Sequence, residues 1–250
     1  MSIKGILFDK DGTLVDFNAT WCAIGDMMAL QAAGGDRARA DWLLEQAGYD
    51  FGAGRFRADS VFAAGTNADI VALWYPDVNE AERDAMVAGF DIFTAQNGAA
   101  KSVPLPGSKE AIAALHASGY RLGVATNDST SGAEKTLLTL GVAQMFEAAY
   151  GYDAVPNPKP APDTVIAFAG LTGLRPSEIA MVGDNRHDLE MARAAGAGLA
   201  VGVLSGTGTR ETLGGLADAI LNSVADLPTF LAEQTIVRSD TVLASTPSPA

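Results

Sequence analysis

Short apolar segments that each end at a polar or glycine-rich loop recur along this chain, and this pattern constrains its fold most strongly. Helical patterns such as Lys109–Ala117 and Asp188–Ala195 separate the later segments. The alternation predicts an α/β fold, a Rossmann-like parallel sheet with helices on both faces and right-handed crossovers. Ligands bind beyond the carboxyl ends of the strands in such sheets, so we expect the polar loops to converge there. The four predicted strands are Ile3–Phe8, Arg121–Ala125, Ile179–Val182 and Leu199–Leu204.

The stretch from Phe17 to about Ala100 departs from this alternation, because it carries helical periodicity and few strand signals. We expect a helical insertion after the first strand, with hinges in the polar or glycine-rich segments 16–18 and 96–101. Its helical patterns are Trp21–Ala33, Arg39–Ala47, Ala68–Trp74 and Asn79–Phe93. The sequence therefore predicts a core domain of residues 1–16 and 101–233, a helical domain of residues 17–100, and a flexible tail of residues 234–250.

Charge and composition exclude several classes of function. The chain of 250 residues has 30 acidic and 17 basic side chains, so it repels nucleic-acid phosphates and anionic membranes, and no local basic patch offsets this. No apolar run approaches the roughly 20 residues that cross a bilayer, and the first residues lack the order of a secretory signal. The single cysteine, Cys22, suits a reducing compartment. We expect a cytoplasmic protein without nucleic-acid or membrane partners, and the sequence leaves its oligomeric state unknown.

Two carboxylates stand two residues apart directly after the first predicted strand, at Asp9 and Asp11. An extended backbone can aim both at one ligand, and Gly12 lets backbone amides approach an anion closely. The pattern Asp-x-Asp-Gly is also typical of turns and of calcium-binding loops. A calcium loop requires a glutamate later in the same loop, and residues 13–18 contain none.

Three further polar sites follow later strands or loops. Thr126 and Asn127 stand at the end of the second predicted strand, Lys159 lies between two prolines, and Asp184 precedes Asp188 by four residues. Each alone is also compatible with a helix cap or a solvated surface charge. Together they form an ordered series that accompanies the Asp9 motif.

In this order and spacing the series resembles the haloacid dehalogenase-like hydrolase superfamily, specifically its phosphoglycolate phosphatase-like branch. The resemblance covers roughly residues 1–16 and 102–231, and in the insertion it implies only a helical cap. Lys10 departs from the family pattern, which more often has an apolar residue there. The four matching motifs are Asp-x-Asp-Gly-Thr at Asp9–Thr13, the threonine after a strand at Thr126, Lys159 within Lys-Pro-Ala-Pro-Asp, and Gly-Asp-x-x-x-Asp at Gly183–Asp188.

The resemblance implies roles for these residues. Asp9 would be the nucleophile that forms an aspartyl-phosphate, and Asp11 would act as general acid and then general base. The phosphate oxygens would be held by Gly12, Thr126, Asn127 and Lys159. A divalent metal ion would be held by the side chains of Asp9 and Asp184 and the backbone carbonyl of Asp11, with Asp188 beside them.

The excess of carboxylates over cations at the predicted site also indicates a bound divalent metal ion. Up to four carboxylates face the single ammonium group of Lys159, so a phosphate dianion would be repelled unless a divalent cation neutralised the site. Oxygen ligands without cysteine or histidine favour Mg²⁺ over zinc.

Other activities of the superfamily fit less well. A dehalogenase does not need the second carboxylate, Asp11. A phosphonoacetaldehyde hydrolase needs a lysine in the cap, and none occurs between Lys10 and Lys101; sugar-phosphate mutases rely on a cap histidine and lysine, and no histidine precedes His116. For His187 we expect a surface or capping role. A non-catalytic binding module stays an alternative from a different class.

The expected partner is a small phosphorylated metabolite, with phosphoglycolate the leading substrate and a sugar phosphate or nucleotide as alternatives. Arg55 and Arg57 lie two residues apart beside glycines, which favours an extended segment in which both side chains point to one side. We hypothesise that one of them binds a carboxylate of the substrate when the cap closes. The alternative is that both are solvated surface charges.

Overall fold

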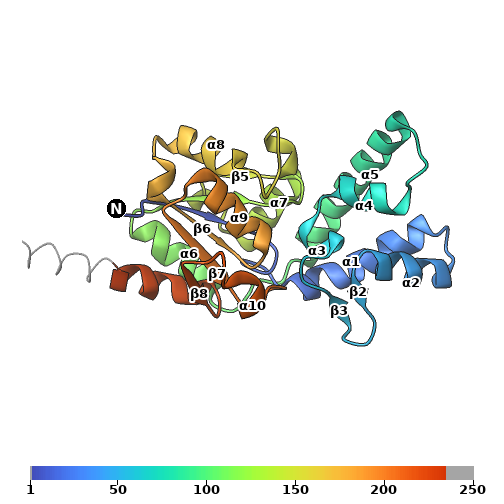
Figure 1. The fold of residues 1–250 in the computed structure, drawn as a ribbon, viewed down its shortest axis with the longest axis horizontal. Coiled ribbons are helices and arrows are strands. Elements are labelled where there is room, and N and C mark those ends of the chain that lie inside the picture. The colour runs from blue at the N-terminus through green and yellow to red at the C-terminus, as the bar shows by residue number, and fades with distance from the viewer. Residues whose placement is uncertain (1, 235–250) are drawn as a thin grey trace, which may run out of the picture.

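The core of the computed structural model, which describes residues 2–234, is a six-stranded parallel sheet (Figure 1). The predicted α/β fold is confirmed, with strand order β5-β4-β1-β6-β7-β8. The four predicted strands are present, and the structure adds one short strand at each edge. The strands are β1 Gly5–Phe8, β4 Arg121–Ala125, β5 Ala148–Tyr150, β6 Ile179–Gly183, β7 Leu199–Val203 and β8 Ala219–Leu221.

Helices cover both faces of this sheet, because side chains alternate between the faces along each strand. In β1, Ile6 and Phe8 pack with the helices of one face, and Leu7 packs with those of the other. The first face carries α6 (Ser108–Ala117), α7 (Thr130–Leu140) and helical residues 227–234. The second carries α8 (Asp163–Thr172), α9 (Arg186–Ala195) and α10 (Arg210–Leu213).

The insertion between β1 and α6 is helical, as predicted, and lies beyond one end of the sheet (Figure 1). It has its own buried cluster, which includes Ile24, Met28, Leu43, Val71 and Trp74. The sequence pattern did not predict its two-stranded hairpin. Its elements are α1 Phe17–Ala32, α2 Arg37–Gln46, β2 Tyr49–Asp50, β3 Arg55–Phe56, α3 Val61–Ala64, α4 Asn67–Trp74 and α5 Glu80–Lys101.

The segment 96–101, where a hinge is expected, is helical, because α5 continues without a break to Lys101; hinge motion stays a prediction. Gly98 is a packing position: a Cβ there would lie 3.7 Å from the ring of Trp21. Ser102 ends the helix, and its hydroxyl donates a 2.7 Å hydrogen bond to the carbonyl of Gly98. At the other boundary Asp16 is the N-cap of α1, accepting a hydrogen bond from the Ala19 amide.

No helix within residues 2–234 is long and apolar enough to cross a membrane. The tail predicted at residues 234–250 lies outside the described residues except for Gln234. The division of the chain into a core domain and a cap domain stays a prediction.

Candidate active site

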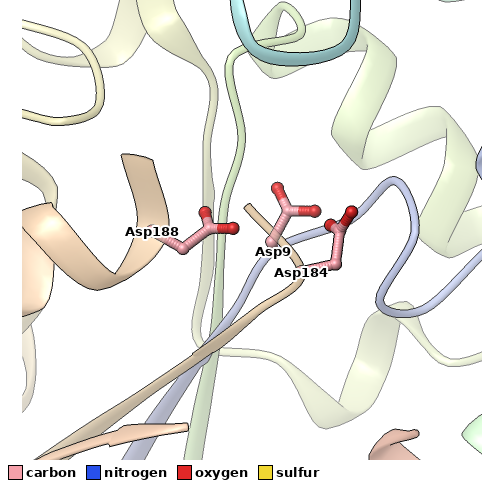
Figure 2. A group of neighbouring side chains, drawn as sticks. All are labelled: Asp9, Asp184 and Asp188. Carbon is pink, nitrogen blue, oxygen red and sulfur yellow. The ribbon is translucent and has the colours of Figure 1, made fainter. Parts of the chain in front are cut away.

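Three carboxylates meet at the carboxyl ends of the central strands (Figure 2). Asp9 directly follows β1, Asp184 directly follows β6, and Asp188 lies in the first turn of α9. Each offers a carboxylate oxygen within 4.8 Å of the others, and all three side chains are buried. The Asp9 amide donates a 2.8 Å hydrogen bond to the Val182 carbonyl, which extends the sheet pairing and fixes where the Asp9 side chain leaves β1.

Lys159 is the cation of this cluster. Its Nζ lies 2.7 Å from Asp9 Oδ1 and 2.6 Å from Asp188 Oδ1. Burial lowers the pKa of the Lys159 ammonium, but the charges of Asp188 and Asp9 raise it by more, so the group stays charged. The surface position considered for Lys159 from sequence is wrong, because its side chain is only 6% exposed.

The candidate metal ligands Asp9 and Asp184 have raised pKa values. Burial raises the pKa of the Asp9 carboxyl well above its usual range, with Asp188 and Asp184 adding to the rise and Lys159 opposing it. Burial together with Asp188 raises the pKa of Asp184 to about 7, against hydrogen bonds from Thr207. The Thr207 amide and hydroxyl lie 2.7 and 3.2 Å from Asp184 Oδ2. A site whose carboxylates resist ionisation in isolation is one that gains from a bound cation.

Glycines pack closely around Asp184. A Cβ added to Gly12, where φ is +86°, would lie 2.6 Å from Asp184 Oδ2, and one added to Gly206 would lie 2.0 Å from it. Ser205 joins the two loops by donating a 2.7 Å hydrogen bond to the Gly12 carbonyl. The sequence identified the Ser205-Gly206 loop only as a strand end, and it did not single out Thr207 as a partner of the site.

Asp11 is held from two sides. Its Oδ2 lies 2.6 Å from Lys10 Nζ, and its Oδ1 accepts a 2.6 Å hydrogen bond from Trp21 Nε1. Lys10 is 1% exposed, also lies 3.1 Å from Asp128 Oδ2, and stands 5.2 Å above the ring of Trp21. Burial lowers the pKa of Lys10 and the charges of Asp11 and Asp128 raise it by more, so this position is a buried ion pair. From sequence Lys10 was only a minor departure from a family pattern.

Asn127 and His187 connect the core to the insertion. Asn127 Nδ2 donates hydrogen bonds to the carbonyls of Ala64, at 2.7 Å, and Lys159, at 3.2 Å. His187 Nδ1 lies 3.2 Å from the same Ala64 oxygen. The expected surface or capping role of His187 is therefore incomplete, since its ring reaches the insertion. Thr126 is buried beside these residues, where its Oγ1 accepts a 3.1 Å hydrogen bond from the Asp128 amide.

One cavity lies between these core loops and the insertion. It brings together six of the predicted site residues: Asp9, Asp11, Thr126, Asn127, Lys159 and Asp184.

Arg55 and Arg57 do not line this cavity, and both side chains are exposed. The predicted extended backbone is confirmed for Arg55, which lies in β3, and Phe56 between the two arginines is buried and paired with Tyr49. The substrate-binding role of these arginines stays a prediction.

The donor set fits a hard divalent cation. Asp9, Asp184 and Asp188 supply buried carboxylate oxygens, and no histidine or cysteine belongs to the cluster. Within residues 2–234 this is the one group of three or more such side chains that could hold a metal ion. Oxygen ligands of this kind suit Mg²⁺.

Comparison with known proteins places this geometry in context. The family model described as haloacid dehalogenase-like hydrolase matches residues 3–196. Phosphoglycolate phosphatase of Salmonella typhimurium is 32% identical over 211 residues, which covers 78% of this chain and 79% of that protein. The crystal structure of a predicted phosphoglycolate phosphatase from Haemophilus somnus superimposes with a TM-score of 0.70 at 25% identity, covering 92% and 98% of the two chains. CbbY from Rhodobacter sphaeroides, solved in complex with phosphate, shares the fold with a TM-score of 0.64 at 22% identity over 90% of this chain and 96% of CbbY.

Proposed function

The chain belongs to the haloacid dehalogenase-like hydrolase family, in its phosphoglycolate phosphatase-like branch, and we propose that it hydrolyses a small phosphate monoester with Mg²⁺ through transfer of the phosphoryl group to Asp9. The observation that carries this proposal is the position of Asp9. Its carboxylate stands at the end of β1 against Lys159, within reach of Asp184 and Asp188, and it faces a cavity that the insertion covers. We propose that this insertion acts as a cap domain.

Asp9 is the proposed nucleophile. One carboxylate oxygen attacks phosphorus, and the bond between phosphorus and the ester oxygen breaks as the aspartyl-phosphate forms. The hydrogen bond from Lys159 Nζ to Asp9 Oδ1 orients the Asp9 carboxylate before the substrate binds. This reduces the reorganisation needed for attack.

Asp11 is the proposed acid and base. In the first step its protonated form donates a proton to the departing alkoxide. In the second step its carboxylate accepts a proton from the water that attacks the aspartyl-phosphate, which regenerates Asp9 and releases inorganic phosphate. The contacts from Lys10 and Trp21 hold the ionised Asp11 carboxyl at the cavity. One of these two contacts must be released when Asp11 carries the proton of the first step.

The phosphate group is held by neutral donors and one ammonium group. Thr126, Asn127 and Lys159 line the cavity and offer donors at the same end of the sheet. Gly12, which the resemblance implies as a phosphate ligand, does not line it, and its amide donates a 2.7 Å hydrogen bond to the Val15 carbonyl. Mg²⁺, held by Asp9, Asp184 and the Asp11 carbonyl with Asp188 beside them, would supply the positive charge that allows a phosphate dianion to approach these carboxylates.

The candidate substrates are phosphoglycolate, which the names of the relatives suggest, a sugar phosphate or a nucleotide. The test is release of inorganic phosphate from p-nitrophenyl phosphate and from a panel of phosphorylated metabolites, compared as kcat/KM in the presence of Mg²⁺. We expect turnover that exhaustive EDTA treatment abolishes, that Mg²⁺ restores and that Ca²⁺ inhibits, because Ca²⁺ prefers more ligands and looser geometry. Full activity after EDTA treatment would contradict the metal requirement, and no turnover of any ester would favour a non-catalytic binding module.

A further inference from the structure

The wall that the insertion contributes to the cavity carries no charged side chain among the described residues. Its side chains are aromatic, aliphatic or uncharged polar. They include Phe17, Trp21, Phe62, Ala63, Asn67 and Ile70. From this composition we propose that the substrate is the phosphate monoester of an uncharged alcohol whose carbon surface packs against this wall, and that a carboxylate on the alcohol is disfavoured. The inference rests on the proposed function and narrows its substrate class, because it disfavours phosphoglycolate among the candidate substrates.

The cations near the site are already paired. Lys159 contacts Asp9 and Asp188, and Lys10 is buried behind the cavity between Asp11 and Asp128. With Asp184, five carboxylates lie in or beside the site against these two ammonium groups. A divalent cation and the phosphate dianion would use what positive charge the site offers, so a second anionic group on the substrate would meet net negative charge at short range.

No basic side chain of the insertion lines the cavity; the insertion has Arg37, Arg39, Arg55, Arg57, Arg83 and Lys101. Arg37 pairs with Asp26 and Asp41 at the surface. Arg57 Nη2 donates a hydrogen bond to the Glu45 carbonyl, and Arg55 is exposed on the hairpin. None of these three lines the cavity.

The insertion is in contact with the core in this arrangement, so the wall described is that of the covered site. Trp21 bonds to Asp11, and Asn127 bonds to the Ala64 carbonyl. A third contact joins the Tyr152 hydroxyl to Asp91 Oδ2 at 2.6 Å, and α5 packs on α7.

The aromatic rings of the wall pack against one another. Phe62 stacks on Phe56 with ring centroids 4.4 Å apart, and it meets the Trp21 ring edge-on at 6.1 Å. The bond to Asp11 fixes the Trp21 ring from its other end. Apolar carbon of a substrate gains by packing on such a surface, whereas a carboxylate loses its hydration there without a compensating donor.

Two matched pairs of esters test the proposal, because each pair exchanges a carboxylate for an uncharged polar group of similar size. Phosphoglycolate is compared with 2-hydroxyethyl phosphate, and 4-carboxyphenyl phosphate with 4-carbamoylphenyl phosphate. We expect the uncharged member of each pair to have the higher kcat/KM, by about tenfold or more. Equal values, or a preference for the charged member, would overturn the proposal. If that preference were lost in Arg55→Ala, Arg57→Ala or His187→Gln, the variant would identify the cation that binds the carboxylate.

A charge placed on the wall supplies the converse test. Ala63 lines the cavity from the short helix α3 and is only partly buried, so Ala63→Lys adds an ammonium group with little disturbance, and Ala63→Gln is the matched neutral control. We expect Ala63→Lys, and not Ala63→Gln, to shift the ratio of kcat/KM toward the charged members by about tenfold. The same ratio in both variants would count against the proposal.

Failure of this inference can be distinguished from failure of the proposed phosphatase activity. If no ester is hydrolysed, phosphatase activity fails, and binding of the four esters to the protein with Asp9→Asn, measured by calorimetry, still decides the inference. Weaker binding of both charged members would support an uncharged substrate class. Tighter binding of either would contradict it.

Discussion

Trp21 Nε1 donates a 2.6 Å hydrogen bond to Asp11 Oδ1, so a side chain of the insertion holds the proposed acid and base of the core. Replacing Trp21 with Phe removes the indole N–H donor and leaves a smaller aromatic ring on the cavity wall. Because a hydrogen bond to a charged group contributes about 1.5 to 3 kcal/mol, we expect kcat to fall about tenfold or more with a smaller change in KM. Steady-state kinetics with thermal unfolding as a folding control checks this. Unchanged kcat in a folded variant would show that Asp11 does not need this contact.

Lys10 is the second group that holds Asp11, and its removal leaves the carboxylates of Asp11 and Asp128 without a countercharge. We expect Lys10→Met to lower the free energy of unfolding by about 3 to 5 kcal/mol, because breaking a buried ion pair leaves uncompensated charge. Adding Asp128→Asn should recover part of the loss, and urea unfolding of the four proteins of this double-mutant cycle measures the coupling. Additive effects would show that Lys10 and Asp128 do not interact.

The buried carboxylates make the metal-free protein sensitive to pH. The pKa of Asp184 is raised to about 7, and that of Asp9 is also raised, so the folded state binds more protons than the unfolded state between the ordinary carboxyl range and pH 7. The resulting stability is present at low pH and is lost as the pH rises through 7. We expect urea unfolding in EDTA to show lower stability at pH 8 than at pH 5.5. Higher stability at pH 8 would contradict the raised pKa values.

Mg²⁺ binding should show the opposite trend, because the ion competes with the proton for Asp184. Displacing one proton from a group with a pKa of about 7 strengthens binding about tenfold between pH 6 and pH 8. Calorimetric titration of Mg²⁺ at the two pH values measures this difference. Binding that does not change with pH would exclude a protonated carboxyl at the metal site.

The glycines around Asp184 allow a sharp steric test. In Gly206→Ala the added Cβ would lie 2.0 Å from Asp184 Oδ2, so the carboxylate or its loop must move. We expect weaker Mg²⁺ binding and a loss of kcat/KM of about a hundredfold or more, since positioning errors of about 1 Å cost that much. Gly170→Ala in α8 is the matched control, because a Cβ there meets nothing within 4 Å. Equal activity of both variants would show that Asp184 does not need its present position.

The strands that the sequence predicted correctly are those whose own residues indicate how deeply they are buried. β1 and β6 are buried on both faces and read as continuous apolar runs, and the polar residues that follow them therefore meet at one edge. The edge strands β5 and β8 have three residues each and are only partly buried, so they leave no comparable pattern. The polar segment 96–101 is part of the helix α5, because one glycine does not end a helix whose buried face continues.

Contacts between distant segments could not be predicted in the same way. From the sequence Lys10 is only a departure from the family pattern, and its burial depends on Asp128 and Trp21, which other segments bring to it. The bonds of Asn127 and His187 to Ala64 depend on how the insertion lies on the core, which no local pattern encodes. The uncharged wall of the cavity is formed by residues of α1, α3 and α4 together, so no single segment of the sequence predicts it.

Trapping the phosphoryl group tests the central claim most directly. The protein is incubated with a ³²P-labelled ester and Mg²⁺ and quenched in acid, and the labelled peptide is mapped by mass spectrometry. A phosphoryl group on Asp9, absent from the Asp9→Asn variant and lost on further turnover, is the predicted result. Label on any other residue, or turnover by Asp9→Asn at the rate of the unaltered protein, would contradict the assignment of Asp9 as the nucleophile.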